Sequence, residues 1–322
     1  MSNILVLGGT GFVGRHVCEQ LQRAGHRTTV PTRHPKHADN VRHLPLLTVL
    51  TADIHRVDEL TQLMAGHDAV INLVAILHGN ERSFEQVHVD LPRTIAQACE
   101  RSGVTRVVHV SALGAATDAP SMYQRSKARG EQVLQAAPLD LTVLRPSVIV
   151  GEGDSFLNLF ARVQQWLPVF PLAGADTRFQ PVWVEDVARA IAHALTHPTT
   201  IGQTVELVGP DVFTLRELAR MAGQAAGCPR PVWGLPRALA YFQALFMEMA
   251  PGVPLMSTDN LSSMEVPNVA SPASAGVATQ ASWGLPAASL RAVLPTYIGP
   301  EAGGLGPRNR LLRLRAKGRW SA

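Results

Sequence analysis

Cysteine, tyrosine and lysine are scarce in this chain of 322 residues, which contains three of each. The cysteines, Cys18, Cys99 and Cys228, lie far apart and form no C-x-x-C pair, which excludes a disulfide scaffold. Cys18 and Cys99 fall within helical apolar patterns, so we expect buried, reduced thiols there. Charged residues make up 17% of the chain and hydrophobic residues 46%, a balance that excludes disorder as the main state.

Long apolar runs are absent as well. The nearest approach to a membrane span, Ala238–Met256, contains Glu248, Pro251 and Pro254, so the sequence predicts no spanning helix. No basic region precedes the apolar run near the N-terminus, which argues against a secretory signal. We therefore expect a cytoplasmic protein, with peripheral binding to the inner face of the cytoplasmic membrane as an open alternative.

The positive charge is concentrated at one end of the chain. The net charge is +4, and residues 301–322 carry six basic side chains and one acidic one, which leaves the rest close to neutral. A near-neutral globule with a basic tail is not a nucleic-acid-binding surface. In the tail, arginines are interleaved with Leu311, Leu312, Leu314 and Trp320. A solvated, disordered tail and contact with an anionic membrane both remain open.

Short apolar, β-branched runs alternate with longer helical patterns through the first 150 residues. Strands are predicted at Ile4–Leu7, Thr28–Thr32, Leu47–Ala52, Ala69–Val74, Arg106–Val110 and Leu141–Leu144. Helices are predicted at Phe12–Ala24, Val57–Met64, Phe84–Arg101 and Tyr123–Ala136. Strands that are apolar nearly throughout are typical of sheets buried on both faces. The alternation predicts an α/β fold with a Rossmann-type, doubly wound parallel sheet.

The regular alternation stops after Gly151, where prolines become frequent. Helices are predicted at Phe156–Trp166, Val184–Thr196, Leu215–Ala226 and Leu235–Met249, with a strand at Thr204–Val208 and an irregular strap over 257–285. We therefore expect three parts: a Rossmann domain over 1–150, a smaller lobe over 151–300 that is partly interleaved with it, and a flexible basic tail over 301–322.

A glycine-rich run follows the first predicted strand and opens the first predicted helix: Gly8-Gly9-Thr10-Gly11-Phe12-Val13-Gly14. Gly8 permits a tight turn, Gly11 lets the backbone approach a pyrophosphate, and Gly14 lets the helix pack on the sheet. The free N–H groups at the helix N-terminus then face the phosphates. This context predicts a dinucleotide site, although a tight turn that binds nothing is the simpler alternative.

The residues after the second predicted strand favour NADP(H) over NAD(H). A carboxylate there would hold a ribose 2′-hydroxyl, but no acid appears before Asp39. Arg33 can instead form a charge-assisted contact with a 2′-phosphate, with His34 or Lys36 assisting. The alternative is that Arg33 lies in solvent. Asp53, after the third strand, is expected near the adenine, or else as a helix cap.

Ser111, Tyr123 and Lys127 form the candidate catalytic set. Tyr123 and Lys127 are four residues apart, so they project from one face of a helix. An adjacent ammonium lowers the pKa of a tyrosine toward the range useful for proton transfer, and the lysine can also bind the nicotinamide ribose. The Ser111 hydroxyl can hold a substrate oxygen. With so few tyrosines and lysines, a chance Tyr-x-x-x-Lys is expected only about 0.03 times.

These motifs together resemble the extended short-chain dehydrogenase/reductase superfamily, which includes NAD(P)-dependent epimerases and dehydratases: Gly8-Gly9-Thr10-Gly11-x-x-Gly14, Ser111, Tyr123-x-x-Ser126-Lys127 and Arg145-Pro146-Ser147. A narrower likeness points to the branch of the nucleotide-binding accessory subunit of respiratory complex I and its bacterial relatives. It is carried by Asn72-Leu73-Val74-Ala75-Ile76-Leu77, Val87-His88-Val89, His109-Val110-Ser111, Phe156-Leu157-Asn158, Gln180-Pro181-Val182 and Asp259-Asn260. The resemblance covers about residues 3–270.

The resemblance implies a Rossmann domain that holds NADPH and a small C-terminal substrate lobe. The expected dinucleotide contacts are Gly8, Thr10, Gly11, Phe12, Val13, Gly14, Arg33, Asp53, Val74, Ala75, Lys127 and Pro146. Asn72-Leu73-Val74-Ala75 departs from the usual Ala-Gly or Ala-Ala pair, which is expected to narrow the nicotinamide site. Two functions stay open: an oxidoreductase of the epimerase, dehydratase or reductase type, or a non-catalytic accessory or assembly protein of a respiratory or quinone-linked membrane complex.

Two further groups of residues have simple structural interpretations. The pairs His34/His37 and His193/His197 have plausible metal-ligand spacing, but neither has a third ligand nearby, so we expect no metal. Tyr241, Phe242, Leu245, Phe246 and Met249 repeat at helical spacing, which favours core packing. The alternatives are an apolar wall for a lipid-like or quinone-like substrate, or a surface that docks on a membrane.

Overall fold

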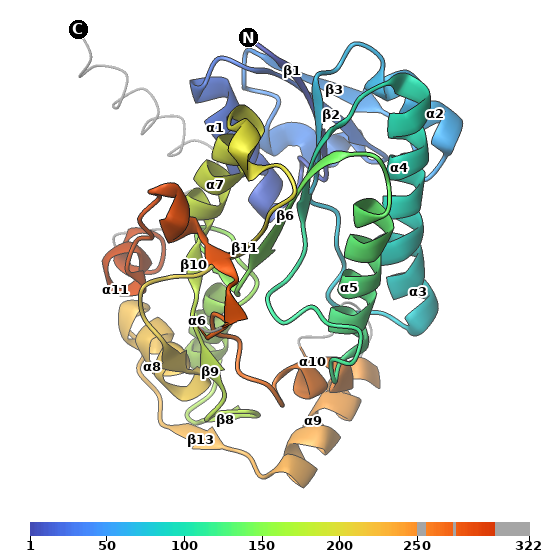
Figure 1. Cartoon of the computed structure of the whole chain (residues 1–322). Coiled ribbons are helices and arrows are strands. Elements are labelled where there is room, and N and C mark those ends of the chain that lie inside the picture. Colours follow the sequence, from blue (N-terminus) through green and yellow to red (C-terminus); the bar gives the residue numbers. More distant parts are fainter. Residues whose placement is uncertain (250–255, 273–274, 300–322) are drawn as a thin grey trace, which may run out of the picture.

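The computed structural model describes residues 1–249, 256–272 and 275–299, and the basic tail lies outside the described residues. Its centre is a parallel sheet of eight strands in the order β14-β11-β6-β5-β4-β1-β2-β3 (Figure 1). These strands are β1 (Asn3–Leu7), β2 (Arg27–Thr32), β3 (Leu47–Thr51), β4 (Ala69–Asn72), β5 (Arg106–Val110), β6 (Asp140–Pro146), β11 (Thr204–Leu207) and β14 (Ala278–Thr279). The predicted Rossmann-type α/β fold is confirmed.

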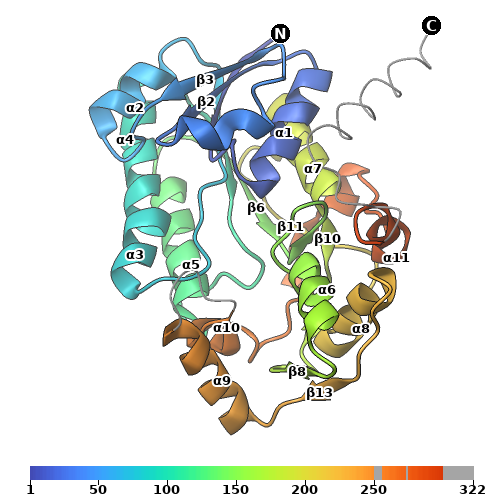
Figure 2. The same ribbon diagram turned by 180° about the vertical axis from the view of Figure 1, so that it is seen from behind.

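Helices cover both faces of this sheet (Figures 1 and 2). α1 (Phe12–Arg23) and α7 (Val184–Thr196) pack on one face, and α2 (Val57–Met64), α4 (Leu91–Ser102) and α5 (Met122–Gln135) pack on the other. Along β1, Ile4 and Val6 enter the first core and Leu5 and Leu7 enter the second. Burial on both faces is why central strands such as β1 and β4 are almost entirely apolar.

The helix predicted over Phe84–Arg101 is interrupted, so that prediction was wrong in its continuity. The structure has α3 (Glu81–Glu85), a π-helical turn over Gln86–Asp90, and then α4. Pro92 lacks the N–H that would bond the His88 carbonyl one turn earlier, so this carbonyl is released from the helical ladder. It packs against α5 at Gly130, where an added Cβ would lie only 1.9 Å from the His88 oxygen.

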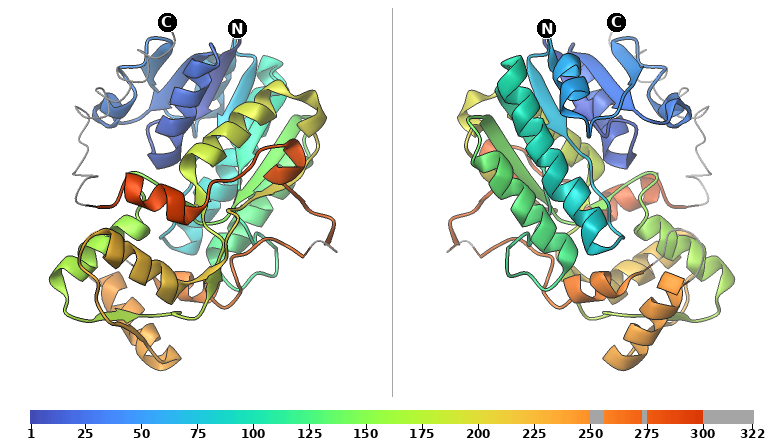
Figure 3. Two further views of the ribbon diagram at one scale, coloured as in Figure 1. Left: turned by 90° about the vertical axis from the view of Figure 1, so that its left-hand side faces the viewer. Right: turned by 90° about the vertical axis from the view of Figure 1, so that its right-hand side faces the viewer.

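A third core forms the smaller lobe, at the end of the molecule opposite the N-terminus (Figure 3). Its helices are α6 (Leu157–Trp166), α8 (Leu215–Ala225), α9 (Arg237–Met249), α10 (Thr258–Ser263) and α11 (Leu290–Val293). Its short strands pair as β7 (Ile149–Val150) with β10 (Val182–Trp183), β9 (Arg178–Phe179) with β12 (Phe213–Thr214), and β8 (Phe170–Leu172) with β13 (Val232–Gly234). α10 and β14 lie in the segment predicted to be irregular.

The two parts of the chain are interleaved through β11, β14 and α7. The strand predicted at Thr204–Val208 was assigned to the smaller lobe, but β11 pairs with β6 in the large sheet, and β14 pairs with β11. α7 likewise returns to pack against α1. Residues beyond 150 therefore complete both the edge and one face of the Rossmann-type fold.

The expectation that the apolar face of α9 packs in the core was wrong. Tyr241, Phe242, Leu245 and Phe246 are all exposed, whereas the buried residues of α9 are Ala240 and Ala244. The side chain of Met249 is not among those described. The helix thus packs on the lobe through its smallest side chains. No helix in the described ranges is long and apolar enough to cross a membrane.

Candidate functional site

The glycine-rich loop lies where the order of the sheet reverses. β1 has β2 on one side and β4 on the other, so the loops that follow β1 and β4 leave in opposite directions. They meet at Gly8, where an added Cβ would lie 3.3 Å from the backbone carbon of Leu73 and from the nitrogen of Val74. Ligands of open α/β sheets bind in this crevice at the carboxyl ends of the strands.

The backbone of the glycine loop is built for close approach. Gly8 has a φ of +84°, a conformation that favours glycine, and its carbonyl accepts the N–H of Gly11 at 3.1 Å. A Cβ on Gly14 would lie 2.3 Å from the Gly8 oxygen. α1 begins directly at Phe12, with no acidic residue in its first turn, and no side chain of the described residues caps its N-terminus. Its first N–H groups are thus available to an anion.

Arg33 lies just beyond β2, on the side of the crevice where an adenine ribose would bind. The side chain is exposed, and among the described residues it has no hydrogen bond or ion pair. Asp39, the first acid after β2, is paired instead with Arg42 at 3.5 Å. Burial lowers the pKa of His55, the Asp53 carboxylate opposes this shift, and Arg33 adds to it. Arg33 and Asp53 therefore lie around the same histidine.

Asp53 does not cap the following helix α2. Its Oδ1 accepts the backbone N–H of His55 at 3.1 Å, while its own N–H donates to Glu59. The residue at the N-cap position of α2 is Arg56. The alternative in which Asp53 caps α2 is therefore wrong, and its contact with the adenine remains a prediction.

Ser111 and Lys127 meet at the end of β5. The Lys127 ammonium donates to the Val110 carbonyl at 2.8 Å, next to Ser111 in the chain. The Ser111 hydroxyl is buried and has no hydrogen-bond partner within the described residues. A buried hydroxyl without a partner is costly, so it indicates a group that a ligand satisfies. Burial lowers the pKa of Lys127 to about 8, while the Glu131 carboxylate opposes the shift.

Tyr123 lies in the first turn of α5, one turn before Lys127. Burial raises its pKa to about 12, and no effect of Lys127 on it is resolved. In this structure the Lys127 ammonium is hydrogen-bonded to the Val110 carbonyl, and its expected effect on the pKa of Tyr123 remains a prediction. Both oxygens of Asp259, from α10, accept backbone N–H groups at the start of α5: Met122 at 2.6 Å and Tyr123 at 3.1 Å.

Two buried histidines at this site had no predicted role. His88 accepts the N–H of Ile76 at Nε2, at 3.1 Å, so its Nδ1 carries the proton toward Ser126 Oγ at 2.8 Å. Ser126 in turn donates to the carbonyl of Tyr123. The ring of His88 also lies edge-on to Tyr123, with centroids 5.5 Å apart. Burial lowers the pKa of His88 to about 3, and the Lys127 charge adds to the shift.

His109, the second of the two buried histidines, contacts Asn72. The Asn72 amide contacts His109 Nδ1 at 3.1 Å, and its oxygen accepts the N–H of Val74 at 3.2 Å. His109 Nε2 has no partner among the described residues. Sequence reasoning used Asn72, His88, His109 and Asp259 only as marks of family likeness. Their polar type inside apolar strands and helices was the available signal.

The remaining predicted dinucleotide contacts lie at the same edge of the sheet. Thr10, Phe12 and Val13 belong to the loop and the first turn of α1, Val74 and Ala75 follow β4, and Pro146 ends β6. The carbonyl of Pro146 accepts the N–H of Leu113, two residues after Ser111. The loop, the ends of β4 to β6 and the start of α5 thus surround one crevice, which fits a dinucleotide.

A cavity of about 1060 Å³ lies between the start of α5 and the smaller lobe. Met122 and Arg125 of α5 form one wall, Asp259 and Leu261 of α10 another, and α9 contributes Tyr241 and Phe242 among others. The cavity borders the first turn of α5, although Ser111, Tyr123 and Lys127 are not among its lining residues.

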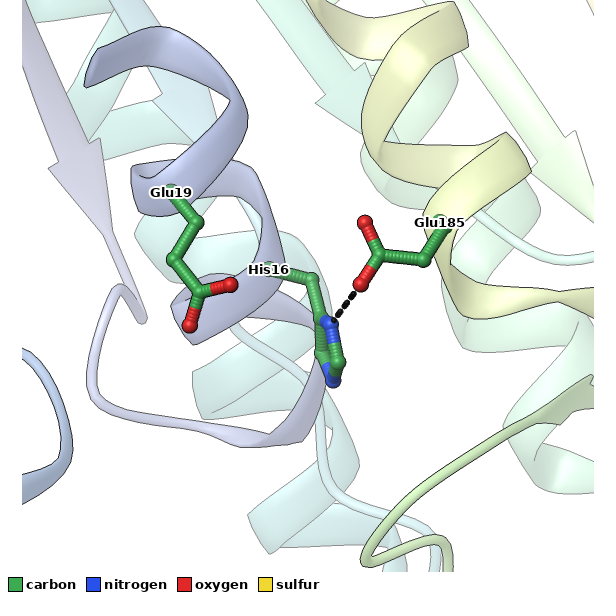
Figure 4. A group of neighbouring side chains, drawn as sticks. All are labelled: His16, Glu19 and Glu185. Carbon is green, nitrogen blue, oxygen red and sulfur yellow. Dashed lines mark hydrogen bonds and ion pairs between the residues drawn. The ribbon is translucent and has the colours of Figure 1, made fainter. Parts of the chain in front are cut away.

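One group of potential metal ligands joins α1 to α7: His16, Glu19 and Glu185, whose ligand atoms lie within 4.8 Å of one another (Figure 4). His16 Nδ1 bonds Glu185 at 2.8 Å, and Arg15 donates to the other ring nitrogen. Arg23 lies 3.9 Å from Glu19 and 4.0 Å from Glu185. Since both ring nitrogens and both carboxylates already have polar neighbours, we interpret the group as a link between the helices.

The two histidine pairs weighed from the sequence are close together in space. The His193 and His197 rings stack at 3.7 Å, and those of His34 and His37 lie 5.4 Å apart. Within the described part of the chain, neither pair belongs to a group of three potential ligands. The absence of a metal remains a prediction.

Residues 4–208 match the family model described as "NAD dependent epimerase/dehydratase family". The chain is 36% identical over 228 residues to the Arabidopsis thaliana protein named NADH dehydrogenase (ubiquinone) 1 alpha subcomplex subunit 9, mitochondrial, covering 67% of this chain and 56% of that protein. It is 30% identical over 237 residues to a ceramide reductase of Caulobacter vibrioides, covering 72% and 73%. The chain spans somewhat more than half the length of the subunit 9 relatives.

Solved structures show the same fold. A nucleoside-diphosphate-sugar epimerase of Staphylococcus aureus superposes with a TM-score of 0.71 at 18% identity, covering 91% of this chain and 99% of that one. The dTDP-glucose 4,6-dehydratase DesIV of Streptomyces venezuelae, solved with NAD and TYD bound, gives a TM-score of 0.65 at 24% identity, covering 72% and 84%.

Proposed function

Because this chain belongs to the NAD-dependent epimerase/dehydratase family, we propose that it is an NADP(H)-dependent oxidoreductase that acts on a carbonyl or carbinol carbon. The observation that carries the proposal is the arrangement of Lys127 and Ser111 at the end of β5. The Lys127 ammonium donates to the Val110 carbonyl, beside the Ser111 hydroxyl, which has no partner in the described part of the chain. Charge and a free donor are thus placed together where a substrate oxygen would develop charge.

Each catalytic residue has a separate task in this proposal. The bound nicotinamide supplies or accepts a hydride. Ser111 donates a hydrogen bond to the substrate oxygen, Tyr123 transfers a proton to or from it, and Lys127 holds the ribose hydroxyls. Since burial raises the pKa of Tyr123 to about 12, its phenol is protonated near neutral pH. A protonated phenol suits the reduction direction, in which Tyr123 acts as the acid.

The cofactor preference rests on Arg33. Its exposed guanidinium lies beyond β2, and Asp39 is engaged with Arg42. A guanidinium free to form a bidentate contact favours a 2′-phosphate, and Asp39, the first acid after β2, lies beside Arg42 rather than open to a 2′-hydroxyl. NADP(H) is therefore the proposed cofactor.

The test is turnover of NADPH with a panel of carbonyl compounds. The name of the Caulobacter relative and the apolar wall of the cavity favour including a ketone with a long alkyl chain. On the best substrate, Tyr123→Phe is expected to lower turnover by roughly 100-fold or more while NADPH affinity stays within about threefold. Tyr297→Phe, which removes another buried hydroxyl, is the matched control. Equal turnover in Tyr123→Phe would rule out this mechanism.

A second candidate is a non-catalytic NADPH-binding subunit or assembly protein of a respiratory membrane complex. It is favoured by the 36% identity to subunit 9 proteins of Arabidopsis and mouse. In that case the dinucleotide would stabilise the fold, since a ligand at a concentration a thousandfold over its Kd adds about 4 kcal/mol to the free energy of unfolding. Exchange of bound dinucleotide for isotopically labelled NADPH separates the two: exchange within seconds supports turnover, and retention for hours supports a structural cofactor.

A further inference from the structure

α9 presents large side chains to solvent. Phe246 is 77% exposed and Phe242 66% exposed, whereas Ala240 and Ala244 face the lobe and are buried. An amphipathic helix of a globular protein ordinarily buries its large apolar face, because moving each large apolar side chain out of water stabilises the fold. α9 has the opposite orientation, with its large apolar side chains in solvent, so its exposed face is a candidate binding surface.

Exposed aromatic residues are concentrated at this end of the molecule. Of the large aromatic side chains that are exposed in the described ranges, Trp233, Tyr241, Phe242 and Phe246 lie on β13 and α9, and Trp166 lies elsewhere, on α6. β13 and α9 form the outer end of the smaller lobe, opposite the N-terminus (Figures 1 and 3). We call Trp233, Leu239, Tyr241, Phe242, Leu245 and Phe246 the α9 face. Amphipathic aromatic side chains are typical of the boundary between water and lipid.

The segment that carries the α9 face, residues 230–247, contains basic residues and no acid. From Arg230 to Met247 the only charged residues are Arg230 and Arg237. The Arg237 side chain is 88% exposed at the start of α9, where its long stem can lie along lipid while its charge reaches the headgroups. Acids also lie nearby: Glu265 pairs with Arg237, and Glu248 accepts from Thr258. Glu265 therefore offsets part of the charge of Arg237, and the positive charge that favours an anionic surface comes mainly from the segment after residue 299.

The sequence beyond the described residues adds to this complementarity. The segment after residue 299 contains six basic residues and one acid. At about 3.3 Å per residue, its 23 residues would span on the order of 75 Å when extended, enough to reach a surface touched by another part of the chain. Each basic residue near an anionic membrane contributes about 1 kcal/mol of attraction.

We propose that the α9 face docks on the surface of an anionic lipid bilayer, with its aromatic and leucine side chains in the interfacial region. The proposal does not depend on catalysis. Tyr241 and Phe242 belong both to the α9 face and to the wall of the cavity beside α5. Docking would therefore bring the cavity next to the lipid, from which an apolar ligand can enter without crossing water.

The test is sedimentation of the full chain with vesicles of phosphatidylcholine containing about one third phosphatidylglycerol. Replacing Phe242→Ser and Phe246→Ser together is expected to lower vesicle binding by about tenfold or more, because both rings leave the interface. Trp166→Ser is the matched control, since Trp166 is the most exposed of these aromatics, at 86%, and lies off the face. Melting temperatures with and without NADPH show whether each variant is folded.

Several outcomes decide the proposal. Loss of binding in the Phe242/Phe246 double variant, with Trp166→Ser unchanged, supports it. Equal binding by wild type and double variant overturns it, as does absence of wild-type binding. It is also overturned if deletion of residues 301–322 alone removes all binding while the double variant keeps it. A wild-type dimer that the double variant converts to a monomer, without vesicle binding, would assign the α9 face to a second copy instead.

Discussion

The carboxylate of Asp259 accepts the backbone N–H of Tyr123 at 3.1 Å and so joins the smaller lobe to the helix that carries the proposed catalytic acid. The second oxygen of Asp259 accepts the N–H of Met122, so one buried carboxylate satisfies two of the unpaired donors at the start of α5. The position of Tyr123 therefore depends on a residue from the other lobe.

We expect Asp259→Ala to lower the free energy of unfolding by about 1–2 kcal/mol, because two charge-assisted hydrogen bonds at a helix N-terminus are lost. Asp259→Asn keeps one acceptor oxygen and should cost less. Urea titration measures both. Asp39→Ala, which removes an exposed carboxylate paired with Arg42, serves as the control and should change stability by less than about 0.5 kcal/mol. A loss in Asp259→Ala no larger than in the control would contradict this role.

Gly14→Ala tests the glycine loop. The new Cβ would lie 2.3 Å from the Gly8 oxygen and 2.6 Å from the Gly9 backbone, so α1 must move away from the loop. If this shift costs about 1–3 kcal/mol of binding free energy, NADPH affinity should fall roughly tenfold to hundredfold. Calorimetric titration measures this affinity. Gly66→Ala controls for general destabilisation, since open space surrounds that position although its φ is +79°. Unchanged affinity in Gly14→Ala would place the dinucleotide elsewhere.

Arg33→Asp tests the cofactor preference. Replacing the guanidinium by a carboxylate removes a phosphate contact and adds a partner for a ribose hydroxyl, so the ratio of NADPH to NADH affinity should fall by roughly tenfold or more. Competitive binding of the two dinucleotides measures the ratio. Arg42→Gln is the comparison, because that arginine lies in the same segment but is paired with Asp39. If both variants keep the wild-type ratio, the assignment to NADP(H) fails.

Stability should decline in acid because His88 is buried in its neutral form. Its pKa is about 3 in the folded protein against the ordinary 6.5, so between these values the unfolded chain binds a proton that the folded chain does not. Stability is therefore retained above pH 6.5 and lost as the pH falls toward 3. His88 alone should account for about 3 kcal/mol between pH 7 and pH 4. The pKa of buried His109, lowered well below 6.5, acts in the same direction.

The variant His88→Gln keeps a donor and an acceptor but cannot titrate, so its unfolding free energy should depend less on pH across this range. Chemical denaturation at a series of pH values gives the slope. His34→Gln, at an exposed histidine, should leave the wild-type slope in place. A full wild-type slope in His88→Gln would assign the acid sensitivity to other groups.

The fold was predictable from sequence wherever burial alone determined the pattern. All six strands predicted in the first 150 residues are present, and the central ones, such as β1 and β4, are apolar because both of their faces are covered. The break between α3 and α4 was missed because it combines a local cause, Pro92, with a distant one, the close packing of His88 against Gly130. The local periodicity of a sequence does not show contacts between segments that are far apart in the chain.

Periodicity also failed at α9, for a different reason. A regular apolar spacing identifies one face of a helix but does not state what covers it. Phe242 and Phe246 fit a core helix by spacing, yet the lobe contacts Ala240 and Ala244. At the candidate site, the glycine loop and the Tyr123–Lys127 spacing were visible because their residues are near one another in sequence. Asp259 was not assigned a role, because it lies 136 residues after Tyr123.

The placement of β11 and β14 has a consequence for synthesis on the ribosome. β6 is bordered on its outer side by β11, which is bordered in turn by β14, and β14 ends at Thr279. A nascent chain that has emerged only as far as residue 150 therefore shows the unpaired backbone of β6 to its surroundings. Such an edge readily pairs with another strand, so chaperone protection during translation would matter more for this protein than for one whose nucleotide-binding half closes on itself.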